Sequence, residues 1–176
     1  HHSGVQERRI QSPHSVHAHL LRGGKEAFDG CIGLTSVVIP DGVTKIGFEA
    51  FYGCTSLASI NVDADNTKYC SVDGVLFTKD MKTLVCYPAG KTGTSYEIPS
   101  SVTSIGDGAF DGCTSLESIT IPSSVTSIGS YAFSGCSGLT SITIPSSVTS
   151  IGDYAFACCD GLTSVAILNG VTSIRE

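Results

Sequence analysis

The sequence predicts a β-rich solenoid of the α/β type: an elongated stack of similar coils, each with short parallel strands and a helical or 3-10 turn. The first observation behind this prediction is an exact internal repeat. The nine residues Ile-Pro-Ser-Ser-Val-Thr-Ser-Ile-Gly occur three times without change, beginning at Ile98, Ile121 and Ile144, and the starts are 23 residues apart. A fixed period in the twenties is the signature of a repeat architecture in which each unit packs on its neighbours.

The second observation is that the residues between these nine-residue blocks also repeat. Apolar side chains return at the same four positions of the period, so that each position forms a column along the stack. The columns are Ala109, Ala132 and Ala155; Phe110, Phe133 and Phe156; Cys113, Cys136 and Cys159; and Leu116, Leu139 and Leu162.

Each coil contains a strand signal followed by a second apolar pair. The alternation of Ile119 and Ile121 favours a short strand with one buried face. Pro122 ends this strand because it has no N–H to donate to a neighbour. Val125 and Ile128 then form the second apolar pair of the coil.

The remainder of the coil is a corner and a turn. Gly129 stands where the chain needs a positive φ or a tight corner. The segment 131–133 is predicted as one turn of α- or 3-10 helix, with Ala132 and Phe133 pointing inward. A single coil cannot bury its own apolar face, so stability is expected only in the stack.

One coil therefore has the pattern Leu-x-x-Ile-x-Ile-Pro-x-x-Val-x-x-Ile-Gly-x-x-Ala-Phe-x-x-Cys-x-x. This pattern extends from about Lys25 to Ile174, and it resembles the leucine-rich repeat of BspA-like proteins. The resemblance implies a right-handed leucine-rich-repeat superhelix. It also implies a cell-surface or secreted protein of host-associated bacteria or parasites, with host matrix or plasma proteins as ligands. The family brings no shared catalytic residues or cofactors to transfer.

Residues 1–24 fit the period poorly, whereas residues 25–176 form the predicted solenoid. Counting back along the period places Val16 at the Ile98 position, which leaves two interpretations: a degenerate edge coil or a disordered end. His1 and His2 are typical of an expression tag. His14, His17 and His19 lack an accompanying Cys or acid at metal-ligand spacing, so solvated side chains are expected.

The period breaks between Val62 and Ile98, and residues 63–97 are predicted to be an irregular coil with an insert. Two β-rich runs, 75–77 and 84–87, flank the polar residues 79–82, a pattern typical of a β-hairpin. The insert is expected to be a structural variant of a coil. The alternative is a contact site, because three aromatic residues gather there outside the repeat: Tyr69, Phe77 and Tyr87.

An acidic loop lies at the start of the insert. Asp63, Asp65, Asn66 and Asp73 hint at calcium, but their spacing does not match the EF-hand loop with its distal Glu. A solvated turn is the better prediction.

The C-terminal end stops part-way through a coil, at Ile174. Solenoids normally cap their apolar ends. We expect either that the chain is a piece of a longer protein or that the end self-associates with another molecule.

Five of the eight cysteines occupy one column of the repeat, which predicts a ladder of buried free thiols rather than disulfides. In the insert, a Cys70–Cys86 disulfide is an alternative to two further thiols. Cys158 is the residue predicted to be an exposed, reactive thiol. The five column residues are Cys31, Cys54, Cys113, Cys136 and Cys159.

Charge and composition exclude several classes of function. The net charge is −6, and no Lys or Arg lies between Thr92 and Ile174, which argues against nucleic-acid binding. The sequence contains no run of 18 apolar residues, so no membrane span is predicted, and no signal peptide is visible. No His follows position 19 to act as base for a Ser or Thr nucleophile, so we predict no enzymatic activity.

Function is therefore expected on the solvent face of the principal strands. The side chains that alternate with buried ones are small and rich in hydroxyls, which suits weak contacts multiplied over several coils better than one strong anchor. Two hypotheses remain: an adhesion module that binds a protein ligand, and a passive structural spacer. The candidate face comprises Ser36, Val38, Ser59, Asn61, Ser95, Glu97, Ser118, Thr120, Ser141, Thr143 and Ser164, followed by Ala166.

Overall fold

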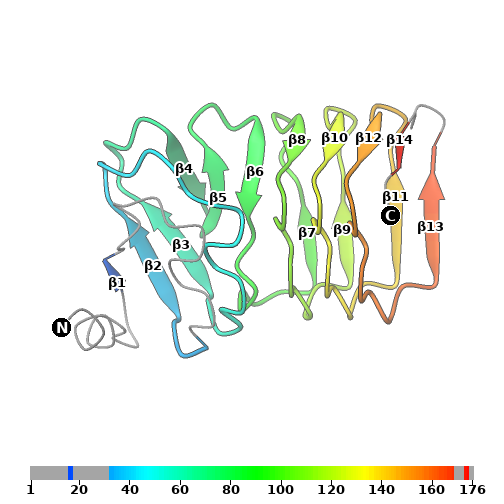
Figure 1. The fold of residues 1–176 in the computed structure, drawn as a ribbon, viewed down its shortest axis with the longest axis horizontal. Coiled ribbons are helices and arrows are strands. Elements are labelled where there is room, and N and C mark those ends of the chain that lie inside the picture. The colour runs from blue at the N-terminus through cyan, green and yellow to red at the C-terminus, as the bar shows by residue number, and fades with distance from the viewer. Residues whose placement is uncertain (1–15, 18–31, 169–172, 175–176) are drawn as a thin grey trace.

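A computed structural model of the chain describes residues 16–17, 32–168 and 173–174. These residues form an elongated stack of coils in which the strands stand side by side in two rows (Figure 1). The first row holds the principal strands, and the second row holds the strands of the meander and the two-residue strand that follows each regular principal strand. The first row is β1 (Val16–His17), β2 (Ser36–Ile39), β3 (Ser59–Val62), β7 (Ser95–Glu97), β9 (Ser118–Thr120), β11 (Ser141–Ile144) and β13 (Ser164–Ile167).

The second row is one seven-stranded sheet with the order β14-β12-β10-β8-β6-β5-β4. Its regular strands pair in parallel at the repeat spacing, with Ser104 opposite Ser127 and Ser127 opposite Ser150. The predicted short parallel strands with a 23-residue period are therefore confirmed. The strands of this sheet are β4 (Tyr69–Val72), β5 (Val75–Thr78), β6 (Thr83–Cys86), β8 (Ser104–Ile105), β10 (Ser127–Ile128), β12 (Ser150–Ile151) and β14 (Ser173–Ile174).

The prediction of helical or 3-10 turns at the Ala-Phe positions is wrong, because the described residues contain no helix. The chain instead makes successive tight turns. Gly108 and Gly112 take left-handed φ values of 63° and 72°, which interrupt a right-handed helical run on both sides of Phe110. The Phe110 amide donates to the Ala132 carbonyl of the next coil at 2.7 Å. Alternate amides of these turns donate to the next coil, whereas the amides between them donate three residues back within the turn, as Asp111 does to Gly108 at 3.0 Å. The backbone is thus satisfied without a continuous helix.

The glycine after the second strand is explained by a tight corner. Gly129 does not adopt a positive φ. A Cβ added to it would lie 2.6 Å from the Asp107 nitrogen, so the preceding coil leaves no room for a side chain. Of the two reasons expected for this glycine, close approach is therefore the operative one.

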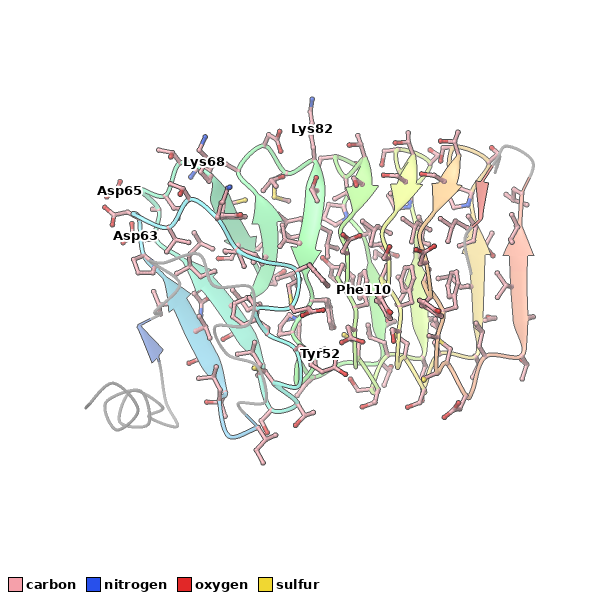
Figure 2. All side chains as sticks on the ribbon, in the orientation of Figure 1. Tyr52, Asp63, Asp65, Lys68, Lys82 and Phe110 are labelled. Atoms are coloured by element: carbon pink, nitrogen blue, oxygen red, sulfur yellow. The ribbon has the colours of Figure 1, made fainter. Side chains whose placement is uncertain are left out.

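The core is a row of stacked side chains along the solenoid axis. The rings of Phe110 and Phe133 lie 5.2 Å apart with an interplanar angle of 10°, and those of Phe133 and Phe156 lie 5.3 Å apart. Tyr87 continues the row on the other side, 5.4 Å from Phe110. Figure 2 shows Phe110 in the region of the regular coils. A solenoid with an aromatic residue at the same position of each coil is expected to stack these rings in a row, as observed here.

The insert is a three-stranded antiparallel meander. The predicted hairpin is confirmed, because β5 and β6 pair in antiparallel fashion around the polar turn. The structure adds β4, which pairs with β5 from Tyr69 opposite Thr78 to Val72 opposite Val75. The sequence pattern did not predict this strand.

Strand β5 joins two cores. Leu76 is fully buried in the N-terminal core, whereas Val75 and Phe77 are fully buried in the core of the regular coils. A strand covered on both faces needs consecutive apolar residues, which explains the run Val75-Leu76-Phe77. The meander thus forms the junction between two blocks of the solenoid.

At the N-terminal end, β1 pairs with β2, with Val16 opposite Val37. This register differs by two residues from the alignment expected by counting back along the period, which placed Val16 opposite Ile39. The rest of residues 1–24, including His14 and His19, and the column residue Cys31 lie outside the described residues.

Candidate binding surfaces

The predicted strand face lies on the first-row strands, where its side chains are exposed or partly exposed. Equivalent residues stand beside one another in register: Ser95 opposite Ser118 and Glu97 opposite Thr120. In the C-terminal coils Ser141 lies opposite Ser164 in the same way. The face is therefore a set of short polar ladders, as its sequence pattern indicates.

The strand face is not one uninterrupted stripe. The described first-row strands fall into three hydrogen-bonded groups, β1-β2-β3, β7-β9 and β11-β13. Between β3 and β7 the chain builds the meander, which occupies the second row. In the first group Ser36 lies opposite Ser59 and Val38 opposite Asn61, and the Asn61 amide donates to the Ser59 hydroxyl at 3.3 Å.

The three insert aromatics do not form a contact patch, which corrects the alternative interpretation of the insert. Phe77 is fully buried and Tyr87 is 3% exposed. Tyr69 is half-buried, and its hydroxyl accepts a hydrogen bond from the Ile46 amide at 3.0 Å. The two-core packing of the meander requires Phe77 and Tyr87 inside, so these two rings stabilise the junction and are not available to a partner.

The acidic loop is organised around a buried asparagine. The Asn66 amide donates to the carbonyls of Pro40 and Val43, at 2.8 and 3.0 Å. Its side-chain oxygen accepts from the backbone of Lys68 and Tyr69. Asn66 thus ties the loop to the preceding coil, a role that explains its burial without a ligand.

The carboxylates of this loop stay at the surface. Asp63 and Asp65 are exposed and project from the end of the molecule near β3 and β4 (Figure 2). The Asp63 carboxylate accepts the Asp65 amide at 2.8 Å, which is an ordinary Asx turn. Among the residues that the structure describes, no group of three His, Cys, Asp or Glu side chains is arranged to hold a metal ion.

The predicted ladder of buried thiols is confirmed for Cys54, Cys113 and Cys136, whereas Cys159 is only partly buried. The Cys136 thiol donates to the Phe110 carbonyl at 3.1 Å and the Cys159 thiol to the Phe133 carbonyl at 3.0 Å. Cys113 repeats the contact with Tyr87 at 3.5 Å. Burial raises the pKa of the Cys136 thiol to about 12, since the thiolate would lose its hydration.

The other thiols in the described part of the chain are also unbridged. Cys70 and Cys86 are both free, so the alternative of a disulfide between them is wrong. The Cys70 thiol donates to the Thr78 carbonyl at 3.4 Å within the meander. Cys158 is exposed, as expected, and it adopts a left-handed φ of 56° at the position where other coils have Gly112 and Gly135.

A hollow that the sequence analysis missed lies at the junction between the two blocks. It is shallow and open to solvent, with a volume of about 20 Å³, which is room for about one water molecule. The sequence contains one related signal. The chain takes three residues from Leu84 to Tyr87, whereas the next coil takes five between the matching residues Ile105 and Phe110. The match is evident only from the structure. The lining residues are Phe48, Phe51, Tyr52, Leu57, Cys86, Tyr87, Pro88, Ala89, Gly108 and Asp111.

Comparison with known families decides the classification of this solenoid. Six copies of the BspA type leucine rich repeat region match residues 22–77 and 87–176. The chain belongs to this family. As a BspA-type protein it has an architecture made of leucine-rich coils, with residues 78–86 of the meander unmatched between two runs of repeats.

Solved structures of bacterial leucine-rich repeat proteins share the fold. A protein from Eubacterium ventriosum is 37% identical, with a TM-score of 0.76, and the match covers 78% of this chain and 37% of that one. The pneumococcal vaccine antigen PcpA is 26% identical (TM-score 0.65, 81% and 42% covered). A leucine rich cell surface protein from Faecalibacterium prausnitzii is 30% identical (TM-score 0.59, 81% and 48% covered).

This BspA-type chain thus spans less than half the length of each of these three relatives. A search of curated proteins gave no match. Within the described residues, no helix has the length and apolar character needed to cross a bilayer.

Proposed function

We propose that this chain is a protein-binding module of a cell-surface or secreted leucine-rich repeat protein, and that it contacts host matrix or plasma proteins. The observation that carries the proposal is the register of the strand face. Side chains of neighbouring coils, such as Glu97 beside Thr120, stand at the spacing of adjacent strands, about 4.8 Å. A long partner segment can contact the same type of group on each coil, so that weak contacts add up.

The relatives support the surface location that the proposal assigns. One is a leucine rich cell surface protein and another is a vaccine antigen of pneumococcus. The charge of the chain supports a protein ligand with basic segments, because acids outnumber Lys and Arg by 16 to 10.

A passive structural spacer is the second candidate. The observation that favours it is the small size of the exposed side chains, which are mostly Ser and Thr on β9, β11 and the start of β13. Interfaces usually depend on Tyr, Trp or Arg anchors, and the described strand face has none of them. A spacer needs only that successive coils stack.

The two functions separate in one binding experiment. Matrix and plasma proteins are immobilised, and binding of this chain is measured over a range of salt concentrations. A protein-binding module gives saturable binding that is lost in Thr120→Arg, which places a large cation on the strand face. The matched control is Ser123→Arg, an exposed position of the same coil outside that face. A well-folded chain that binds none of the immobilised proteins would establish the spacer.

A further inference from the structure

Two exposed tyrosines stack on each other on the turns that follow β10 and β12. Tyr131 comes three residues after the end of β10, and Tyr154 comes three residues after the end of β12. The two strands pair directly, so their turns are neighbours in the stack (Figure 1). The ring centroids lie 5.3 Å apart with an interplanar angle of 25°. The two residues are 43% and 54% exposed, so this pair belongs to the surface and not to the core.

The backbone at both tyrosines has a conformation that the preceding coil provides with a glycine. Tyr131 and Tyr154 have left-handed φ values of 57° and 54°, and Gly108, at the same position of its own coil, has a φ of 63°. Bulky residues rarely adopt this conformation, whereas Gly adopts it without steric cost. The geometry of the turn therefore does not explain why two coils carry a tyrosine at this position.

The row of surface rings stops at Tyr131. Gly108 contributes no side chain to it, and among the described residues the Tyr131 ring stacks on no aromatic ring other than Tyr154. The face of the Tyr131 ring opposite Tyr154 is thus not stacked on a third ring. Ring faces of this kind are where a cationic side chain of a partner can be attracted.

The tyrosine pair lies in the part of the chain whose negative charge is not offset. Residues 92–168 contain six Asp and Glu and no Lys or Arg. Residues 32–91, by comparison, contain six acids and five lysines, so their charges nearly cancel. The regular coils that carry the two tyrosines therefore produce a negative field, which attracts cationic partners.

Carboxylates also lie close to the tyrosines along the backbone. The Asp107 carboxylate accepts a hydrogen bond at 2.8 Å from the amide of Ser130, the residue before Tyr131. Asp153 is the residue before Tyr154, and its carbonyl accepts the Tyr131 amide at 2.9 Å. Each tyrosine thus follows a residue that either bears a carboxylate or is bonded to one.

We propose that the Tyr131–Tyr154 pair is the anchor on which a basic segment of a protein partner docks, an assignment that rests on the protein-binding function proposed above. Tyr is among the residues that contribute most to interfaces, and the strand face has none. A basic segment gains both from the ring faces and from the unpaired acids around them. An acidic segment would be repelled by the same field, and an uncharged segment would gain nothing from it.

The proposal is tested on the whole chain with a capped peptide in which arginine alternates with glycine. Ring protons of Tyr131 and Tyr154 are followed by NMR during titration. The expected result is a saturable shift of these signals, with an affinity that falls as salt is added because salt screens the acids. The matched control is the same peptide with glutamate in place of arginine, which is expected to leave the signals unchanged.

Variants separate the tyrosine pair from the rest of the surface. Tyr131→Gly and Tyr154→Gly are each expected to weaken binding of the arginine peptide by about two- to fivefold. Both should stay folded, because Gly108 shows that the turn accepts Gly at this position. The control is Tyr52→Ala, which removes an exposed tyrosine from the part of the chain with balanced charge and should leave binding unchanged.

Unfolding curves of the variants distinguish docking from a purely structural role. A structural role for the two rings would lower the free energy of unfolding and leave peptide binding by the folded chain unchanged. Docking predicts the reverse, weaker binding by a chain of nearly unchanged stability. Asp153→Asn should also weaken binding, and Asp63→Asn, an exposed acid of the balanced part, is its control.

Three results would overturn the assignment: no saturable shift, an equal shift with the glutamate peptide, or equal losses in the control variants. The peptide is not a natural ligand, so this outcome is independent of the assay on immobilised proteins. In that assay, undiminished binding of a matrix or plasma protein by Tyr131→Gly would reject the tyrosine pair and leave the protein-binding function. Peptide binding without any matrix or plasma ligand would reject the proposed host ligands and leave the tyrosine pair.

Discussion

The Cys136 thiol donates a hydrogen bond to the carbonyl oxygen of Phe110, 26 residues earlier in the chain, at 3.1 Å. The same contact joins Cys159 to Phe133. It links the turn of one coil to the Phe position of the coil before it. The thiol column therefore stabilises the stack between coils, in addition to filling the core.

Removal of one thiol from this ladder should weaken the stack. Cys136→Ala removes the bond and a few buried atoms, and we expect the free energy of unfolding to fall by about 1–2 kcal/mol. Urea unfolding followed by circular dichroism measures the change. Cys158→Ala, at an exposed position, is the control and should stay within about 0.5 kcal/mol. Equal effects of the two variants would contradict a stabilising role for the ladder.

The aromatic column should be more sensitive than the thiol column. Phe133 is fully buried and stacks on Phe110 and on Phe156. Phe133→Ala is expected to lower the free energy of unfolding by about 3–5 kcal/mol, because it leaves a cavity between two rings. Tyr131→Ala is a matched comparison, since that ring also stacks on a neighbour, Tyr154, but is 43% exposed. A loss of similar size in Tyr131→Ala would show that ring stacking, and not burial of the ring, makes the larger contribution to the free energy of unfolding.

The corner glycines should tolerate no side chain. In Gly129→Ala the added methyl group meets the Asp107 nitrogen at 2.6 Å, and we expect a loss of about 1–3 kcal/mol from overpacking. Gly33→Ala is the control, because a Cβ there meets nothing within 4 Å. The measurement is thermal or denaturant unfolding of both variants. Equal stability of Gly129→Ala and the parent chain would mean that the coils separate easily at this corner.

Rising pH above about 9 should lower the free energy of unfolding. Burial raises the pKa of the Cys86 and Cys136 thiols from 9.0 to about 12. The unfolded chain therefore loses these protons first, and the stability they contribute is complete below pH 9 and lost as pH rises toward 12. Denaturant unfolding between pH 8 and pH 11 tests this. Cys136→Ala should show a shallower decline, and an unchanged slope would refute the contribution of that thiol.

Thiol reactivity should follow exposure. Treatment of the native chain with a thiol-specific reagent at pH 8, followed by peptide mass spectrometry, is expected to modify Cys158 well before Cys113 and Cys136. Denaturant should remove this difference. Early modification of Cys136 in the native chain would contradict the buried ladder.

The period of the chain was sufficient to predict the solenoid, the parallel strands and the buried columns. Each of these features depends on contacts between equivalent residues of neighbouring coils. Such residues lie 23 positions apart in the sequence, as Phe110 and Phe133 do, so the repeat itself indicates which residues meet. The type of turn was not predictable in the same way. Whether Ala109 and Phe110 sit in a helix depends on backbone angles at Gly108 and Gly112, and the amide partners that settle those angles come from the next coil.

The burial of the insert aromatics also required the tertiary structure. Phe77 has no counterpart in the repeat pattern, and only the folded chain places Tyr87 in the Phe row, so the sequence left open whether these rings face a core or a partner. The meander places β5 between two cores, and that placement buries Phe77.

By itself, the sequence determined that this chain stacks 23-residue coils around columns of Phe, Cys and Leu. The reason is that positions buried in every coil recur at a fixed spacing and carry the same apolar residue types. Only the tertiary structure decided where the stack is recessed. The hollow at the junction brings together Tyr52 and Asp111, which belong to coils separated by the whole insert. Relationships of this kind have no period, so no repeat pattern could reveal them.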